Sequence, residues 1–112
     1  MFEGLPFQPV PGAVSKGKIQ FFALSTCGFC RRGQDFLEEH GIAYEFIHLD
    51  RLSAEVKALT KEQFKTAFGA TLSYPALVLE DGRHVVGYVK RAWEDLLGLP
   101  HEEPISEVEA IE

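Results

Sequence analysis

Apolar and polar positions alternate along the chain in a pattern that predicts strands and helices in the order β-α-β-α-β-β-α. Compact apolar runs at residues 18–24 (KIQFFAL) and 43–49 (AYEFIHL) are typical of buried strands. The segment between them, residues 28–40, has the pattern of a helix. Its apolar side chains near one face are Phe29, Phe36 and Leu37. A strand, a helix and a second strand within about 30 residues predict two parallel strands joined by a right-handed crossover.

The second half of the chain predicts two more helices and two short strands. These elements are expected at residues 54–68 (helix), 76–79 and 84–87 (strands) and 92–97 (helix). Within the first of them, Thr60 and Gln63 have the spacing of a capping box, so the helix is expected to break near Thr60. Asp81 and Gly82 separate the two strands, and this dipeptide is a strong signal for a two-residue hairpin turn.

The two ends of the chain lack a regular pattern. The first residues hold prolines and glycines without periodicity, although Phe2, Leu5 and Phe7 offer apolar side chains that can pack on the surface. Five glutamates fall within the last twelve residues, which predicts a frayed, acidic end. The chain is therefore expected to divide into an extended lead-in (1–17), one domain (18–99) and an acidic tail (100–112).

Charge and composition exclude several classes of function. The chain has 17 acidic and 11 basic residues and a net charge of −6, which argues against a nucleic-acid partner. No run approaches the roughly 20 apolar residues of a membrane span, and the N-terminal residues lack the pattern of a signal peptide. Only two cysteines occur, three positions apart, whereas small secreted proteins use several in a disulfide framework. We therefore expect a cytoplasmic protein with no membrane association.

The two cysteines are the strongest candidates for chemistry. Cys27 and Cys30 lie where the first long strand ends and the first helix begins. A thiol at a helix N-terminus faces unpaired backbone N–H groups and the positive end of the helix dipole, which favour the reactive thiolate. Gly28 and Phe29 in the first turn, and the charge of Arg31, are the expected thiolate-stabilising features, although an arginine there is equally typical of solvated helix surface. Cys27 is thus the expected attacking sulfur.

Cys30 lies one turn further into the helix and is the expected resolving sulfur. In the cycle that follows from exchange chemistry, Cys27 attacks a substrate disulfide and Cys30 then displaces the reduced substrate. Two alternatives weigh against this cycle. A structural zinc site needs four Cys or His ligands, and the four histidines lack paired spacing, so no metal is expected. Two inert, buried cysteines are the other alternative.

Residues 18–99 resemble the glutaredoxins. Three features carry the resemblance: the strand–Cys-Gly-Phe-Cys–helix junction, Tyr74-Pro75 before the third strand of the domain, and Asp81-Gly82 followed by Gly87-Tyr88 before the last helix. The resemblance implies an α/β, thioredoxin-like fold of glutaredoxin type with a four-stranded mixed sheet and a cis bond before Pro75. It also implies thiol–disulfide oxidoreductase activity, with Cys27 and Cys30 as the catalytic pair and Tyr74, Pro75, Gly87 and Tyr88 binding the substrate.

Three positions depart from the pattern of glutathione-using members. Leu24 stands where they usually carry a lysine, Val89 where they tend to have an aspartate, and Gly28 where dithiol members commonly have proline. Hydrogen bonds to charged groups contribute about 1.5–3 kcal/mol each, so losing two anchors lowers affinity by about two orders of magnitude. The expected substrates are protein or glutathione-mixed disulfides. Either glutathione or thioredoxin reductase is expected to supply electrons, because the chain also resembles glutaredoxin-like reductants of ribonucleotide reductase.

Two further functions stay open at this point. The order Cys27-Gly28-Phe29 resembles the start of the motif in monothiol glutaredoxins, where one cysteine and glutathione hold a [2Fe–2S] cluster between two subunits. Cys27 is the ligand in that alternative. Cys30 instead favours dithiol chemistry in a monomer with no tightly bound cofactor. The third reading is a thioredoxin-fold interaction domain without redox activity.

Overall fold

The computed structural model describes residues 2–101, so most of the expected acidic tail lies outside the described residues. Within that range the chain forms five strands, three α-helices and one short 3₁₀ helix. In chain order these are β1 (Gln8–Val10), β2 (Ile19–Ala23), α1 (Gly28–Glu39), β3 (Tyr44–His48), η1 (Leu49–Arg51), α2 (Ala54–Phe68), β4 (Ala76–Leu79), β5 (His84–Val86) and α3 (Lys90–Leu97). None of the described helices is long and apolar enough to cross a membrane.

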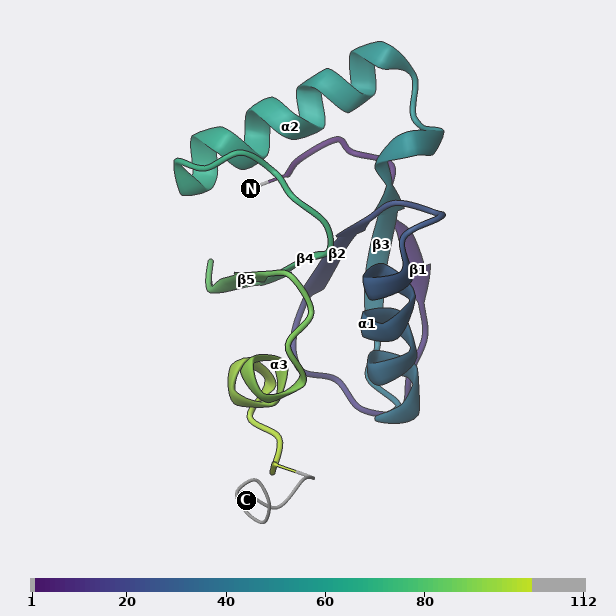
Figure 1. Ribbon diagram of the computed structural model, residues 1–112, viewed down its shortest axis with the longest axis vertical. Coiled ribbons are helices and arrows are strands. Elements are labelled where there is room, and N and C mark those ends of the chain that lie inside the picture. The colour runs from purple at the N-terminus through teal and green to yellow at the C-terminus, as the bar shows by residue number, and fades with distance from the viewer. Residues whose placement is uncertain (1, 102–112) are drawn as a thin grey trace.

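The strands form one mixed sheet in the order β1-β3-β2-β4-β5 (Figure 1). β2 and β3, which α1 connects, pair in parallel, as the sequence predicts. The other strand pairs are antiparallel. The expectation of four strands is wrong, because β1 adds a fifth strand antiparallel to β3. Pro9 lies in β1, and an edge strand tolerates proline because one side of the strand makes no ladder hydrogen bonds.

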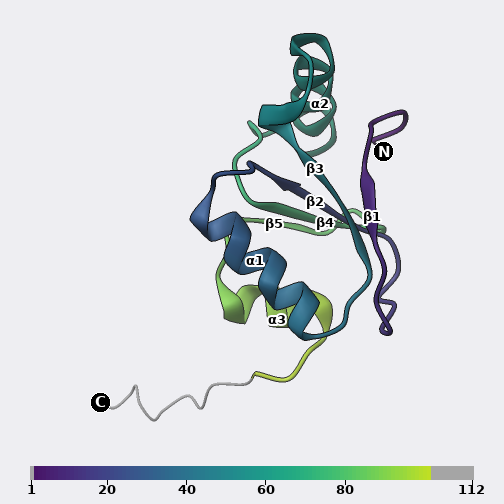
Figure 2. The same cartoon turned by 90° about the vertical axis from the view of Figure 1, so that its right-hand side faces the viewer.

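The helices cover the two faces of the sheet. α1 and α3 lie on one face and α2 lies on the other (Figure 2). Neighbouring positions of β2 point to opposite faces, so Phe21 packs with Trp93 under α1 and α3, while Phe22 packs with Phe64 under α2. The aromatic residues of the chain thus divide between two cores, one on each side of the sheet.

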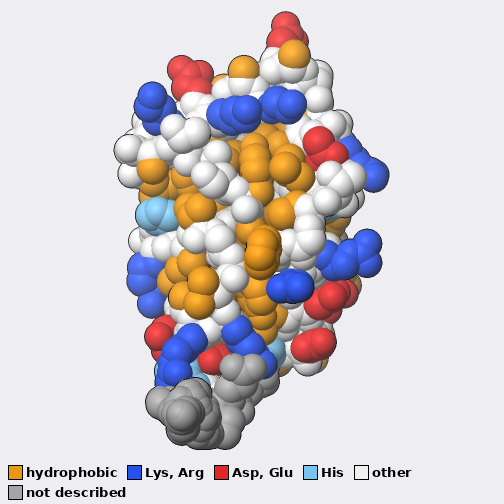
Figure 3. Space-filling view, viewed as in Figure 1, with side chains coloured by type: hydrophobic (Ala, Val, Ile, Leu, Met, Phe, Trp, Pro, Cys, Tyr) orange, Lys and Arg blue, Asp and Glu red, His pale blue; other side chains and the backbone are white. Residues whose placement is uncertain are grey.

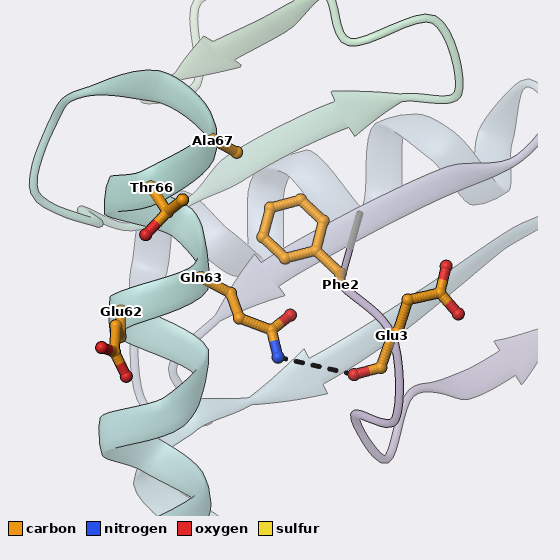
Figure 4. A pocket seen from close by; sticks show the side chains of 6 residues that line it. All are labelled: Phe2, Glu3, Glu62, Gln63, Thr66 and Ala67. Atoms are coloured by element: carbon orange, nitrogen blue, oxygen red, sulfur yellow. Dashed lines mark hydrogen bonds between the residues drawn. The ribbon is translucent and has the colours of Figure 1, made fainter.

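The N-terminal segment packs more deeply than the sequence predicts. Phe2 is only 5% exposed, and its ring centroid lies 4.9 Å from that of Phe22 in the core under α2. Beside the Phe2 ring, a hollow of about 440 Å³ lies between the N-terminal segment and α2. The Gln63 side-chain amide reaches across this hollow to the Glu3 carbonyl at 3.5 Å (Figure 4). Residues before β1 are therefore part of the packed structure.

α2 is continuous, so the predicted break near Thr60 is wrong. The Thr60 side chain is buried, and its hydroxyl donates to the Val56 carbonyl at 2.8 Å within the helix. A threonine that bonds back to the carbonyl four residues earlier does not act as a cap. Ser53 is the N-cap instead, accepting the Val56 N–H at 3.2 Å, and Gly69 ends the helix in the left-handed conformation with φ 69°.

The β4–β5 hairpin has a longer loop than the sequence predicts. Gly82 N–H donates to the Leu79 carbonyl at 3.0 Å, and Leu79 N–H donates to the Arg83 carbonyl at 2.8 Å. Gly82 has φ 95°. This is the three-residue loop in which a type I turn is followed by a left-handed residue. The Asp81 carboxylate adds a hydrogen bond from the Arg83 backbone N–H at 3.0 Å.

Candidate functional site

The two cysteines lie at the first turn of α1, and both are free thiols. Cys27 is the N-cap, with extended backbone (φ −94°, ψ 122°), and its sulfur accepts the backbone N–H of Cys30 at 3.2 Å. The Cys27 carbonyl accepts the Arg31 N–H at 3.0 Å as the first helical hydrogen bond. A negative charge on the Cys27 sulfur is therefore met by a backbone donor at the positive end of the helix.

The two sulfurs differ in their access to solvent. Cys27 is partly exposed, whereas Cys30 is 2% exposed and packs in the core under α1. Burial, followed by the hydrogen bond with the Cys27 side chain, raises the pKa of Cys30 to about 12. Cys30 is thus a protonated, sheltered thiol behind an accessible one. Because of this asymmetry an external disulfide can reach Cys27, whereas Cys30 is shielded behind it.

The loop before Cys27 is held by a residue that the sequence analysis missed. Ser25 donates its backbone N–H to one carboxylate oxygen of Asp50 at 2.9 Å and its hydroxyl to the other. These hydrogen bonds lower the pKa of Asp50. The signal in the sequence is the parallel pairing itself, because Ala23 at the end of β2 pairs with His48 at the end of β3. Residues that follow the two strand ends are therefore neighbours.

A polar groove of about 360 Å³ opens beside the dithiol. Its walls are one side of α1 and the segment that ends β3. The residues that line it are Leu24, Ser25, Cys27, Cys30, Arg31, Gln34, Asp35, Glu38, His48 and Arg51. The groove gives the buried Cys30 a polar neighbourhood that includes His48. The sequence did not predict this, because its histidines were considered only as metal ligands.

The four predicted substrate-binding residues lie around the start of β4 and the end of β5. The bond between Tyr74 and Pro75 is cis, as the resemblance implies. Tyr74 is half-buried, and burial, followed by the charge of Cys30, raises the pKa of its hydroxyl. Gly87 N–H donates to the Pro75 carbonyl at 2.6 Å. Tyr74 packs against the cores on both faces of the sheet, and the charge effect of Cys30 places it near the dithiol.

Gly87 and Tyr88 also connect this region to α3. The Gly87 carbonyl accepts the indole N–H of Trp93 at 2.9 Å, and the Tyr88 ring packs edge-on against the Trp93 ring with centroids 4.9 Å apart. Both residues therefore have a packing role. Substrate contact at these two positions stays a prediction.

Of the predicted thiolate-stabilising residues, Gly28 opens α1 and Arg31 lines the groove. Phe29 does not join the buried face with Phe36, because its side chain is 59% exposed. Its ring instead lies under the Arg32 guanidinium, with 5.3 Å between the guanidinium carbon and the ring centroid. The first turn of α1 therefore presents an aromatic ring and two arginines to solvent.

The positions that depart from the glutathione-binding pattern offer no charge. Leu24 is half-buried against the core under α2, and Val89 is 60% exposed.

Hydrophobic side chains gather in a band down the middle of the face that α1 borders (Figure 3). Of the elements beside this band, α1 carries the exposed Phe29 and β5 carries the exposed Val86.

Comparison with known proteins identifies the family of this site. The glutaredoxin family model matches residues 19–85, which is more than half of the chain and includes both cysteines. A search of curated protein sequences gives no match to this chain.

Solved structures share the fold. A methanoredoxin from Methanosarcina acetivorans is 28% identical, with a TM-score of 0.70, and the match covers 79% of this chain and 90% of that one. A glutaredoxin from Archaeoglobus fulgidus is 31% identical, with a TM-score of 0.65 and coverage of 72% and 86%. A glutaredoxin from Methanosarcina mazei Go1, at 24% identity, shows the fold alone, with a TM-score of 0.72 and coverage of 88% and 96%. The fold is thioredoxin-like, with a mixed sheet and three helices.

Proposed function

The chain belongs to the glutaredoxin family, and we propose that it reduces protein or glutathione-mixed disulfides through Cys27 and Cys30. The observation that carries the proposal is the asymmetry of the two thiols. Cys27 is accessible and accepts a backbone N–H at the helix start, while Cys30 is buried one turn behind it. A dithiol exchange cycle uses this division between an attacking and a resolving sulfur.

The proposed cycle has two displacement steps. The Cys27 thiolate attacks one sulfur of the substrate disulfide, and the other sulfur leaves as a thiolate with the electron pair of the broken bond. Cys30 then loses its proton and attacks the Cys27 sulfur, which releases the second substrate sulfur as a thiolate. The substrate has gained two electrons, and the protein is left with a Cys27–Cys30 disulfide that an external dithiol or two thiols must reduce.

The geometry favours a protein disulfide as one class of substrate. The band of hydrophobic side chains beside α1 suits a polypeptide surface, since exposed apolar patches mark interaction sites (Figure 3). Leu24 and Val89 lack the charged groups that hold the two ends of glutathione in related proteins. We therefore propose thioredoxin reductase or glutathione as the electron source, with the choice resting on whether other groups replace these anchors.

Turnover with two sources of electrons tests the proposal. Reduction of a glutathione-mixed disulfide is followed with glutathione and its reductase in one assay and with thioredoxin reductase in the other. Turnover with glutathione means that groups other than Leu24 and Val89 hold the tripeptide. Turnover with thioredoxin reductase alone means that the protein does not use glutathione as its electron source. Lack of turnover in both assays, with Cys27→Ser as the matched inactive control, contradicts the proposed activity.

The cluster-binding alternative needs ligands beyond those of this chain. Among the described residues no group of three or more Cys, His, Asp or Glu side chains converges as a metal site. Cys27 offers one accessible thiolate, so a [2Fe–2S] cluster needs ligands from a second chain and from glutathione. The dithiol cycle needs neither, because both sulfurs lie on one turn of α1. We therefore propose that the protein works as a monomer without a tightly bound cofactor, in the cytoplasm, where thiols are kept reduced.

A further inference from the structure

The resolving step of the proposed cycle needs a proton acceptor near Cys30. Burial is the largest influence on the pKa of the Cys30 thiol and raises it, so the resolving sulfur carries its proton at neutral pH. Cys30 is 2% exposed, so its proton must leave through the groove that it lines. A group that shares a polar space with Cys30 and is neutral at working pH can take that proton as the sulfur attacks.

The direction of the β3 side chains brings His48 to the α1 side of the sheet. Tyr44 and Phe46 pack in the core under α1, and the Tyr44 hydroxyl donates to Glu38 of α1 at 2.9 Å. Side chains two positions apart share a face of a strand, so His48 points the same way. Its ring centroid lies 4.9 Å from that of Phe46, and it lines the groove together with both cysteines.

The other polar groups near the groove are poorer acceptors. Both carboxylate oxygens of Asp50 are already occupied, because each accepts a hydrogen bond from Ser25. Arg31 and Arg51 are cations. Asp35 and Glu38 lie on the α1 wall, about 7 and 12 Å beyond Cys30 along the helix axis. Glu38 already accepts a hydrogen bond from the Tyr44 hydroxyl.

We propose that His48 accepts the proton of Cys30 across this groove, through a bridging water, as Cys30 attacks the mixed disulfide on Cys27. The inference rests on the proposed dithiol function and names the acceptor in its second step. The Cys27–Cys30 bond forms and the Cys27–substrate bond breaks. The electron pair leaves on the substrate sulfur, and the proton passes from Cys30 to His48 and then to the departing thiolate or solvent. A polar groove of about 360 Å³ has room for the water.

The charge state of His48 suits this role at neutral pH. Burial is the largest influence on its pKa and lowers it. The charge of Arg51 acts in the same direction, and that of Asp50 acts against it. The imidazole is therefore neutral at pH 7 and able to accept a proton. Protonation at lower pH removes the acceptor, so the resolving step slows as the pH falls through the pKa of His48. The attack by Cys27 does not share this dependence.

Stopped-flow reaction of the reduced protein with 5,5′-dithiobis(2-nitrobenzoate) separates the two steps. Attack by Cys27 releases one thionitrobenzoate, and resolution by Cys30 releases the second. We expect His48→Gln to slow the second phase tenfold or more at pH 7, within the usual range for loss of a general base, and to leave the first phase unchanged within twofold. His84→Gln is the matched control, because His84 is exposed and stacks on Phe68 of α2.

A second variant keeps the test valid if the glutamine perturbs packing. In His48→Ala, added imidazole should restore the rate of the second phase in proportion to its neutral form. Two outcomes overturn the inference and leave the dithiol function standing: an unchanged second phase in His48→Gln, or equal slowing of both phases without rescue by imidazole. Absence of the first phase in the wild type is the separate failure of the proposed function itself.

Discussion

Substitution of Gly33 by alanine should destabilise the protein, although the same change in most helix interiors stabilises. Gly33 lies in the middle of α1, on the side that packs against α3. A Cβ atom built there lies 2.6 Å from Cη2 of Trp93 and 3.2 Å from two further atoms of the same ring. Carbon atoms in contact prefer about 3.5–4.0 Å, so the ring or the helix must move by about 1 Å.

The Trp93 ring has little room to move. It is fully buried, its indole N–H is bonded to the Gly87 carbonyl, and the rings of Phe21 and Phe36 pack edge-on against it with centroids 5.9 and 6.0 Å away. Overpacking in such a core costs about 1–3 kcal/mol. Alanine returns about 1 kcal/mol through its higher helix propensity. Because the Cβ would lie only 2.6 Å from a ring atom, we expect the upper part of the overpacking range, about 2–3 kcal/mol, and therefore a net loss of about 1–2 kcal/mol of stability.

Urea unfolding followed by circular dichroism measures this loss as a lower midpoint with an unchanged slope. Gly28→Ala is the matched control in the same helix, because its Cβ meets no atom within 4 Å. That variant should keep the stability of the wild type. In a Trp93→Phe background, Gly33→Ala should cost less, which a double-mutant cycle reports as a coupling between the two positions. A Gly33→Ala protein as stable as the wild type would refute the proposed close approach of α1 and α3.

Two further predictions concern residues outside the dithiol. Phe2→Ala should lower the free energy of unfolding by about 3–5 kcal/mol, as expected for a buried phenylalanine, and a loss below 1 kcal/mol in urea unfolding would show that the N-terminal segment does not pack under α2. Hydrogen bonds from Ser25 lower the pKa of Asp50 in the folded protein. Their contribution to stability is therefore fully present above the unfolded-state pKa of about 3.9, and it is lost as the pH falls through the lower folded-state pKa. The stability advantage of the wild type over Asp50→Ala should therefore be constant from pH 6 to 5 and shrink below pH 4. A constant difference down to pH 3 would contradict the tether to Ser25.

Local sequence patterns were sufficient to predict the centre of the site. The end of an apolar strand, followed by Cys27 and Cys30 at the start of an amphipathic helix, locates both thiols, because each signal depends only on neighbouring residues. The parallel pairing of β2 and β3 followed from the same segment. The resemblance to glutaredoxins added the cis bond at Pro75, which a lone proline does not indicate.

The features that the sequence did not reveal depend on distant contacts. β1 is three residues long, contains Pro9 and has no alternating pattern, so only its pairing with β3 defines it as a strand. Thr60 has the spacing of a cap, yet burial and its bond to a carbonyl decide its role. Cys30 and His48 line the same groove only because α1 crosses over the sheet between β2 and β3. Their separation in the sequence does not indicate this.

Trapping of the mixed disulfide tests the central claim most directly. The Cys30→Ser protein is incubated with a glutathione-mixed disulfide of a model peptide and analysed by mass spectrometry of its proteolytic fragments, beside Cys27→Ser and the wild type. We expect a stable adduct on Cys27 in Cys30→Ser, no adduct in Cys27→Ser, and a Cys27–Cys30 disulfide in the wild type. An adduct on Cys30 that forms as readily in Cys27→Ser, or a wild type that forms no internal disulfide, would contradict the roles assigned to the two sulfurs.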